Sequence, residues 1–462
     1  MPETRPSVLI AGITGFIGRA LARRLQGRFR VIGLSRTPPG TCEGSEWRCC
    51  DLFSLLQCEK ALEGVHQAFY LVHSMLPSAH LTQGNFEDMD LIIADNFARA
   101  AARAGVRQII YLGGLSPESG PLSRHLRSRL EVEKTLSLYG TPVTSLHSGV
   151  VIGARGSSYK ILETFLRRLP VVPCPVWTNT PMQPIALQDL LELLVYCLEH
   201  PSGGNRRFEV GCPDVMSYRE FLARLARQLG LRRVFVGLPG CGTQMARRVV
   251  SLVTGAPAPL VRPLIESMKC PMAACSLDLQ REAGIRPMGF EQAVRKAQEE
   301  EKEKPDARRI SKLPRHTVRS VQRMPLPSGW SARRIAEEYV RWIPGLFRTG
   351  VVAEADSELR LRFRLAFPRV LLLELSYAAD RSAASDRQVF YVTGGWLAHK
   401  TQQLTRRPRL EFREALGGAC LLAAIHDYRP TLPWPLYNLT QAWIHLWVMR
   451  RFAQHLRGAA ET

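Results

Sequence analysis

The chain has 462 residues, of which 62 are Lys or Arg and 41 are Asp or Glu, so its formal net charge is +21. The length exceeds one ordinary domain of about 100 to 200 residues and predicts two or three domains. The charge favours partners that bear phosphate, or an anionic membrane surface, over basic partners. Because the arginines are spread along the chain, no nucleic-acid partner is expected, and an anionic membrane surface stays an alternative.

The first residues, MPETRPSV, lead directly into an apolar strand without the pattern of an export signal, so a cytoplasmic protein is expected. The 11 cysteines show no CxxC pair and fit a reducing compartment, so neither disulfides nor a metal site is expected. Attachment to the inner face of a membrane remains open.

Residues 7–200 alternate short apolar runs (VLIAG, VIGLS, AFYLVHS, QIIYLGG) with helical patterns such as DLIIADNFARAAARAG. This rhythm is typical of βαβ units and predicts an α/β fold with a doubly wound parallel Rossmann sheet. The mixed segment that follows, with its amphipathic SYREFLARLARQLG helix, is expected to form a small substrate cap. The first predicted domain therefore spans residues 1–295.

Residues 296–330 are expected to form a basic, proline-containing linker, since residues 302–334 hold ten Lys or Arg and only two acidic residues. After it, ELRLRFRLAF alternates apolar side chains with arginines, and RLEFRE, RVLLLELSY and QVFYVTGG predict further strands of an antiparallel sheet. A long C-terminal helix is expected to present one apolar stripe that contains Leu439, Trp443, Leu446, Trp447 and Phe452. Residues 331–462 are thus predicted to be an α+β domain in which a curved sheet grips one helix.

The first strand is followed by glycines at positions 12, 15 and 18, within VLIAGITGFIGRALARRL. Strand, glycine spacing and following helix agree with a loop whose backbone amides and positive helix end face a pyrophosphate. The residues expected to bind a dinucleotide here are Gly12, Thr14, Gly15, Phe16, Ile17 and Gly18.

The end of the second strand decides between NAD and NADP. An NAD-selective site has a carboxylate there, but no acidic residue lies between Glu3 and Glu43, where there are seven arginines. Arg36, after Ser35, offers a planar fork to a 2'-phosphate, so NADP is favoured over NAD. Asp51 and Leu52, after the third strand, either border the adenine or form a simple turn.

The motif GITGFIG, Ser35 with Arg36, Asp51 with Leu52, and YLVHSM at residues 70–75 together resemble the atypical and extended short-chain dehydrogenase/reductase superfamily. The chain is most similar to the branch of NmrA-like regulators and of the accessory subunit of respiratory complex I, specifically to bacterial YbjT-type proteins. That resemblance implies NAD(P) binding and a C-terminal domain of START or polyketide-cyclase type, which would hold an apolar ligand.

Reductases of this superfamily use a Ser, a Tyr and a Lys, and the chain departs at all three places. Gly113 and Gly114 stand where the Ser is expected, with Ser116 a little further on. His125 and Arg129 occupy the YxxxK spacing; an imidazole can move a proton near neutral pH, and a guanidinium can hold a ribose or phosphate.

Five further residues have both a functional and a structural interpretation. His73 and Ser74 end the fourth strand and either border the nicotinamide ribose or contact backbone. His147 falls where relatives often have an Arg, Tyr159 faces either a substrate or the core, and Asn96 joins either an active-site water network or the backbone. His73, His125 and Arg129 are the candidate catalytic residues.

Residues 430–449 contain no charged side chain but hold three prolines, so they predict a poor membrane span. The segment is expected either to pack as a C-terminal helix or to lie on an anionic bilayer surface. In sum, the sequence predicts an NADP(H)-binding, reductase-like protein acting on an apolar carbonyl, quinone or lipid-like small molecule. The alternative is a non-catalytic NADPH sensor or an accessory protein of a membrane or respiratory assembly; the oligomeric state is left open.

Overall fold

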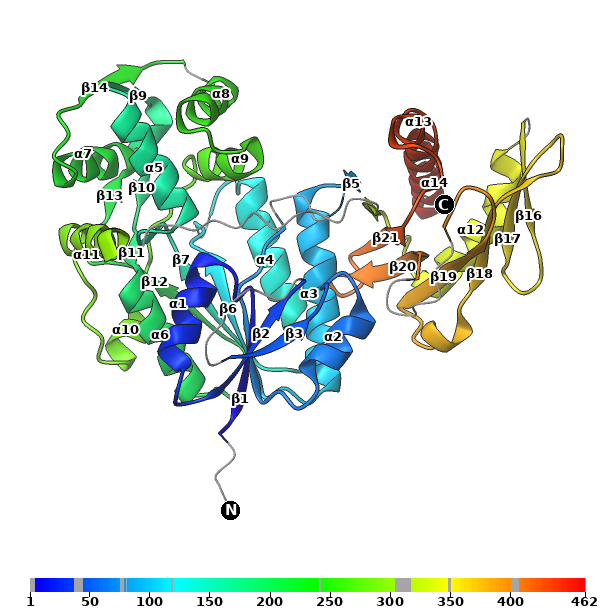
Figure 1. Ribbon diagram of the computed structural model, residues 1–462, viewed down its shortest axis with the longest axis horizontal. Coiled ribbons are helices and arrows are strands. Elements are labelled where there is room, and N and C mark those ends of the chain that lie inside the picture. Colours follow the sequence, from blue (N-terminus) through cyan, green and yellow to red (C-terminus); the bar gives the residue numbers. More distant parts are fainter. Residues whose placement is uncertain are drawn as a thin grey trace. The chain divides into compact units, whose positions relative to one another are not determined.

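The computed structural model describes residues 5–36, 45–74, 79, 81–117, 119–240, 242–303, 317–347, 350–399 and 407–461. The chain forms two compact units (Figure 1). The first comprises residues 1–51, 57–76 and 97–310, and the second comprises residues 52–56, 77–96 and 311–462. Residues 304–316 of the expected linker lie outside the described part, and residues 318–324 form a strand, so the domain limits at 295 and 330 stay a prediction.

The first unit contains a parallel sheet in the order β12-β7-β6-β4-β1-β2-β3. Its strands are β1 (Ser7–Ala11), β2 (Arg30–Ser35), β3 (Glu46–Cys49), β4 (Gln67–Tyr70), β6 (Gln108–Gly114), β7 (Val143–Ser148) and β12 (Arg206–Val210). In open α/β sheets a ligand binds in the crevice outside the carboxyl ends of the strands where the order reverses, and here that position is between β1 and β4. This arrangement confirms the doubly wound α/β prediction.

Helices cover both faces of this sheet. They are α1 (Phe16–Leu25), α2 (Leu55–Leu62), α3 (Phe86–Arg103), α4 (Arg124–Leu136) and α6 (Leu187–Glu199); α2 and α3 begin in the second unit and end in the first. On one face, Leu21 of α1 and Leu190 of α6 share a core with Phe69 of β4. On the other, the ring of Tyr70 lies 5.0 Å from that of Phe97 in α3. Alternating side chains of β4 thus serve both layers.

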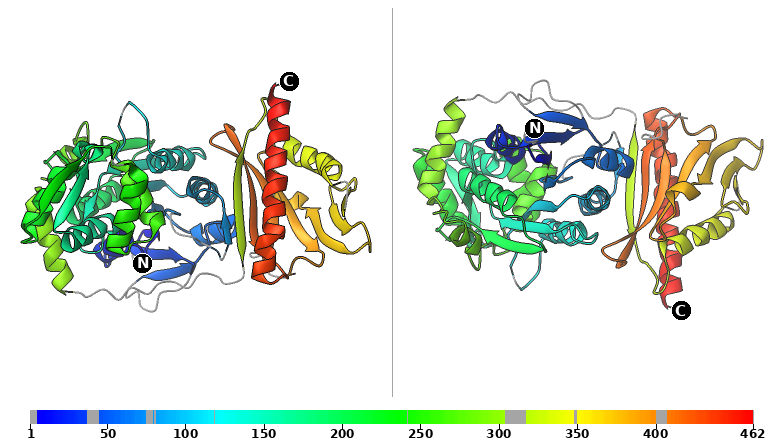
Figure 2. Two further views of the ribbon diagram at one scale, coloured as in Figure 1. Left: turned by 90° about the horizontal axis from the view of Figure 1, so that it is seen from above. Right: turned by 90° about the horizontal axis from the view of Figure 1, so that it is seen from below.

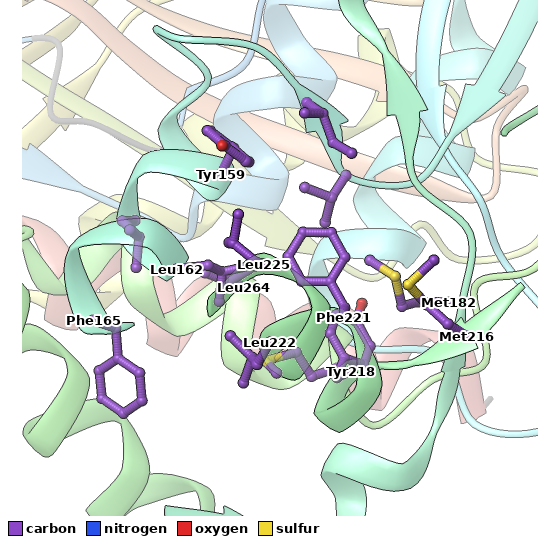
Figure 3. Packing of buried hydrophobic residues seen from close by; sticks show 14 of the residues in the cluster. Tyr159, Leu162, Phe165, Met182, Met216, Tyr218, Phe221, Leu222, Leu225 and Leu264 are labelled. Carbon is purple, nitrogen blue, oxygen red and sulfur yellow. The ribbon is translucent and has the colours of Figure 1, made fainter. Parts of the chain in front are cut away.

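The remaining elements of the first unit form a cap. They are β8 (Val151–Ile152), α5 (Ser157–Arg168), β9 (Val171–Pro175), β10 (Pro181–Met182), β11 (Ile185–Ala186), β13 (Met216–Ser217), α7 (Tyr218–Gln228), β14 (Val234–Leu238), α8 (Thr243–Thr254), α9 (Ala258–Ser267), α10 (Asp278–Glu282) and α11 (Phe290–Glu303). Figure 3 shows the apolar cluster that holds them together, in which Leu162, Phe221 and Met182 are buried. The cap therefore has a core of its own.

The second unit is built on a sheet in the order β16-β17-β18-β19-β20-β21-β15-β5. Its strands are β5 (Leu81–Gln83), β15 (Val318–Met324), β16 (Val351–Ala355), β17 (Leu361–Leu365), β18 (Leu371–Tyr377), β19 (Arg387–Gly394), β20 (Arg409–Ala415) and β21 (Cys420–Tyr428). All neighbours are antiparallel except β15 and β5, which are parallel. The expected C-terminal sheet is present, and β15 lies within the segment that the sequence assigned to the linker.

Two helices, α12 (Ala332–Leu346) and α14 (Gln441–Glu461), pack on this sheet (Figure 2). A short helix, α13 (Trp434–Leu439), directly precedes α14. Most residues of the apolar stripe expected on the C-terminal helix do not lie on the face that packs on the sheet. Phe452 is buried, but Leu439, Trp443 and Trp447 are exposed, and the buried positions are Ala442, Val448, Met449, Phe452 and Leu456. The first half of α14 carries apolar residues all round, so spacing alone could not identify its buried face.

Phe452→Ala is expected to destabilise the second unit by about 3–5 kcal/mol, because its ring packs against Tyr339 and Phe412 in a closed core. Trp443→Ala, a large truncation on the same helix, is expected to change the free energy of unfolding by no more than about 0.5 kcal/mol. Denaturant unfolding of the full chain, followed by circular dichroism, measures both. A larger loss for Trp443→Ala would mean that the two faces of α14 are reversed.

Candidate functional site

The glycine loop between β1 and α1 brings backbone segments closer together than any side chain allows. Gly12 has a φ of +93°, and a Cβ there would lie 2.7 Å from the carbonyl oxygen of Leu71, just after β4. A Cβ on Gly18 would lie 2.3 Å from the carbonyl oxygen of Gly12. Glycine is therefore required at both positions, as in a loop that folds tightly under a pyrophosphate.

The start of α1 is open to a ligand. Gly15 precedes the helix as its N-cap and carries no capping side chain, so the first amides of the helix keep their capacity for an anion. Thr14 and Gly15 are exposed, and Phe16 and Ile17 are half-buried. The ring of Phe16 packs under the turn at Gly153 and Gly156, where a Cβ would come within 2.6 and 3.2 Å of it. These residues fit a bound dinucleotide pyrophosphate.

At the carboxyl end of β2, Ser35 is half-buried and Arg36 is exposed. The thiol of Cys49, at the end of β3, donates to the carbonyl of Arg36 over 3.2 Å, which fixes the backbone there. The Asp51 amide donates to the side chain of Gln57 over 2.8 Å. The carbonyl of Leu52 accepts from the Asn96 side chain, so Asn96 is bonded to backbone.

The candidate catalytic residues gather around the end of β4 and the first turns of α4. The guanidinium of Arg129 lies 3.4 Å from the carbonyl oxygen of Val72, next to His73 and Ser74. Burial, followed by the positive charges of Arg129 and His73, lowers the pKa of His125 to about 3. The imidazole of His125 is therefore neutral at pH 7, whereas the sequence suggested a group that ionises near neutral pH.

The end of β6, where the usual Ser is expected, is tightly packed. A Cβ on Gly113 would lie 3.2 Å from the His147 ring, and one on Gly114 would lie 3.2 Å from Leu126. Tyr111, two residues earlier, donates from its hydroxyl to the Arg129 carbonyl over 3.0 Å. The side chains of His147 in β7 and Leu126 in α4 thus pack against the glycines at the end of β6. The hydrogen bond from Tyr111 holds α4 against the sheet.

His147 takes part in a hydrogen-bond network with an ion pair. Its Nε2 lies 2.9 Å from a carboxylate oxygen of Glu133, which also accepts two hydrogen bonds from Arg207 at 2.9 and 2.7 Å. Burial would raise the pKa of Glu133, but the hydrogen bonds from His147 and Arg207 outweigh it and lower that pKa to about 2. The network joins α4 to β7 and β12, so His147 positions the helix that carries His125 and Arg129.

Sequence reasoning missed Glu133 and Arg207. Glu133 is one turn beyond Arg129 on the same helix, a spacing that could have been noticed, but nothing along the chain links it to Arg207. Tyr159 is 2% exposed and lies in the cap core (Figure 3), where burial and then the charges of Glu163 and Glu301 raise the pKa of its phenol. It is a packing residue.

Within the described residues, no group of His, Cys, Asp and Glu side chains could hold a metal ion. A search of the same residues finds no helix whose length and apolar character would let it cross a bilayer.

Comparisons with known proteins agree with the fold of the first unit. Residues 8–211 match the model of the NAD dependent epimerase/dehydratase family. The sheet has the strand order of NAD(P)-binding proteins, so this region has an NAD(P)-binding, epimerase- or reductase-like fold. The match leaves the second unit unassigned.

Among curated proteins, the chain is 32% identical over 142 residues to the auxiliary protein GraX of Staphylococcus aureus. The aligned region covers 30% of this chain and 43% of GraX. The match thus spans less than half of that relative's length. Two solved structures superpose with a TM-score of 0.50. They are a nucleoside-diphosphate-sugar epimerase from Staphylococcus aureus (14% identity, 63% of this chain, 99% of that one) and a triphenylmethane reductase from a Citrobacter species (17%, 63% and 99%).

Proposed function

We propose that the first unit binds NADP(H) and reduces an apolar carbonyl, quinone or lipid-like molecule. The observation that carries this proposal is the glycine loop at the β1/β4 crevice, together with Arg36 at the end of β2. A pyrophosphate there would accept hydrogen bonds from the first amides of α1. The match of residues 8–211 to the NAD dependent epimerase/dehydratase family supports dinucleotide binding.

Arg36 favours the phosphorylated coenzyme. The end of β2 is where the adenosine ribose lies in this class of fold, and NAD-selective proteins place a carboxylate there. This chain has no acidic residue from position 4 to position 42, and an exposed guanidinium occupies the strand end. A planar fork can bind a 2'-phosphate through two charge-assisted hydrogen bonds.

When bound, the reduced coenzyme would supply a hydride. Arg129, held against Val72 at the end of β4, would orient the nicotinamide ribose. His125 is neutral, so it would donate a hydrogen bond to the substrate oxygen and polarise the carbonyl, as a neutral imidazole can. Exposed His73 would pass a proton from solvent to the alkoxide that forms.

The cap supports an apolar substrate. The hydroxyl of Ser123, which caps α4, lies 3.2 Å from that of Ser267 at the end of α9. Leu126, one residue after His125, belongs to the apolar core of the cap. The cap core beside His125 is thus apolar apart from these two hydroxyls, which supports a ligand with few polar groups.

A second candidate function is a non-catalytic NADPH-binding accessory role. Gly113, His125 and Arg129 replace the Ser, Tyr and Lys of the reductases, and Arg129 cannot deprotonate. The relative with 32% identity is an auxiliary protein by name. This alternative predicts coenzyme binding without turnover.

Arg36→Asp is expected to weaken NADPH binding by about tenfold to a hundredfold, since two charge-assisted hydrogen bonds are replaced by repulsion, and to leave NADH binding nearly unchanged. Fluorescence titration with both coenzymes measures this. Arg23→Asp is the matched control, because it makes the same charge change at an exposed position in the last turn of α1. Equal coenzyme preference in Arg36→Asp and the wild type would contradict the assignment of NADP.

The full chain is expected to oxidise NADPH with at least one member of a panel of apolar aldehydes, ketones and quinones. The double variant His125→Ala, Arg129→Ala should lose about a hundredfold or more of this rate and still bind NADPH. Arg127→Ala, an exposed change on the same helix, should keep the rate. The wild-type rate should show no inflection from His125 near pH 6.5, because burial places its pKa at about 3.

Absorbance at the NADPH band follows the reaction. Tight NADPH binding with no oxidation on any member of the panel would overturn the reductase proposal and support the accessory role.

A further inference from the structure

The second unit exposes a stripe of large apolar side chains along α13 and the first half of α14. The exposed fractions are 48% for Leu436, 76% for Leu439, 62% for Trp443, 51% for Ile444 and 42% for Trp447. Within α14, Trp443 and Trp447 are four residues apart and lie one above the other on the helix. We define these five residues as the tryptophan stripe. Single exposed apolar side chains are ordinary, but five within twelve residues of consecutive helices are typical of an interaction surface.

None of the five residues of the tryptophan stripe belongs to the buried core of the unit. The opposite side of α14 supplies Ala442, Met449, Phe452 and Leu456 to the buried side, and Phe452 closes the aromatic core with Tyr339 and Phe412. In Figure 2, α14 is the red helix that lies along the sheet of this unit. One face of the helix therefore holds the unit together, while Trp443 on the other face is exposed and Trp447 is partly exposed, with its ring centroid 6.1 Å from that of Phe347.

The next turns of the same outward face are cationic. Arg450, Arg451 and Arg457 follow Trp443 at spacings of seven, eight and fourteen residues, which keeps them on or beside its face. All three are exposed, and none forms an ion pair with any residue in the described part of the chain. No Asp or Glu occurs between Trp434 and Ala460. The surface thus combines an apolar end with a positive end.

This combination selects one occupant. Among the described residues, no helix is long and apolar enough to cross a bilayer, and this includes α14. In contact with a bilayer, the exposed indoles of α14 would therefore lie at the bilayer surface. Tryptophan is suited to the boundary between headgroups and acyl chains, and arginines bind anionic headgroups. A second copy packed with its helix parallel to the first would bring the same arginines close to one another, so like charges oppose that form of self-association. The antiparallel form is an outcome that sedimentation equilibrium tests.

We propose that α13 and α14 bind the surface of an anionic lipid bilayer. Trp443 and Trp447 enter the headgroup boundary, and Arg450, Arg451 and Arg457 contact lipid phosphates. Because the surface belongs to the second unit alone, this proposal is independent of the proposed reductase function.

The test uses the full chain and two kinds of vesicle, phosphatidylcholine alone and phosphatidylcholine with phosphatidylglycerol, in flotation assays. The wild type should float with the anionic vesicles and much less with the neutral ones. Trp443→Glu with Trp447→Glu should reduce the bound fraction about tenfold or more. Arg450→Gln with Arg451→Gln and Arg457→Gln should remove the preference for anionic vesicles and its dependence on salt.

Two controls match these variants. Leu252→Glu introduces a charge at an apolar position of α8 that is 85% exposed, and Arg333→Gln removes an exposed charge on α12; both should bind as the wild type does. Thermal unfolding checks that each variant is folded. If the tryptophan variant, Trp443→Glu with Trp447→Glu, fails to fold, a second experiment tests the same contact without any substitution. It measures quenching of wild-type tryptophan fluorescence by lipids with brominated acyl chains.

Three results would overturn the proposal: no flotation of the wild type with anionic vesicles, equal flotation of the tryptophan variant, or no quenching by brominated lipid. A wild-type dimer in sedimentation equilibrium that the tryptophan variant dissociates, without vesicle binding, would also overturn it and assign the face to a second copy of the chain.

Discussion

The close approach of three backbone segments around Gly12 and Gly18 is the constraint on which the first unit depends. The loop after β1 passes within van der Waals distance of the chain after β4, and α1 begins beneath it. A single methyl group at either glycine would separate these segments. This packing places the open first turn of α1 at the strand-order reversal, and the pairing of β2 with β1 places Arg36 at the same edge of the sheet.

The chemistry around the crevice differs from that of reductases with a Ser, a Tyr and a Lys, and the packing explains part of the difference. His147 and Leu126 lie so close to the end of β6 that a side chain there would have to displace them by a few tenths of an ångström. His147 is in turn held by Glu133, whose carboxylate also binds Arg207. The site therefore has a fixed cationic side chain at Arg129 and a neutral imidazole at His125. Such a pair can orient a ribose and polarise a carbonyl group, but it does not provide a phenol with a lowered pKa as the proton donor.

Features with local causes could be predicted from the sequence, and features with distant causes could not. The glycine loop, the parallel sheet and the strands of the second unit were predicted because each has its own spacing pattern. The pairing of β5 with β15 joins residues 81–83 to residues 318–320, and no pattern in either segment indicates it. The expected stripe on the C-terminal helix combined exposed Trp443 with buried Phe452, because the first half of α14 has apolar residues on several faces and their spacing does not identify the buried one. The low pKa of His125 arises from burial, which only the folded chain supplies.

Calorimetric titration of NADPH into the wild type and into Gly18→Ala tests the central claim most directly. A matched control is Gly204→Ala, where an added Cβ meets no atom within 4 Å. The account predicts one NADPH per wild-type chain and per Gly204→Ala chain, and a loss of about a hundredfold or more in affinity for Gly18→Ala in a chain that remains folded. Unchanged NADPH affinity in Gly18→Ala would contradict the claim that this glycine loop forms the coenzyme site.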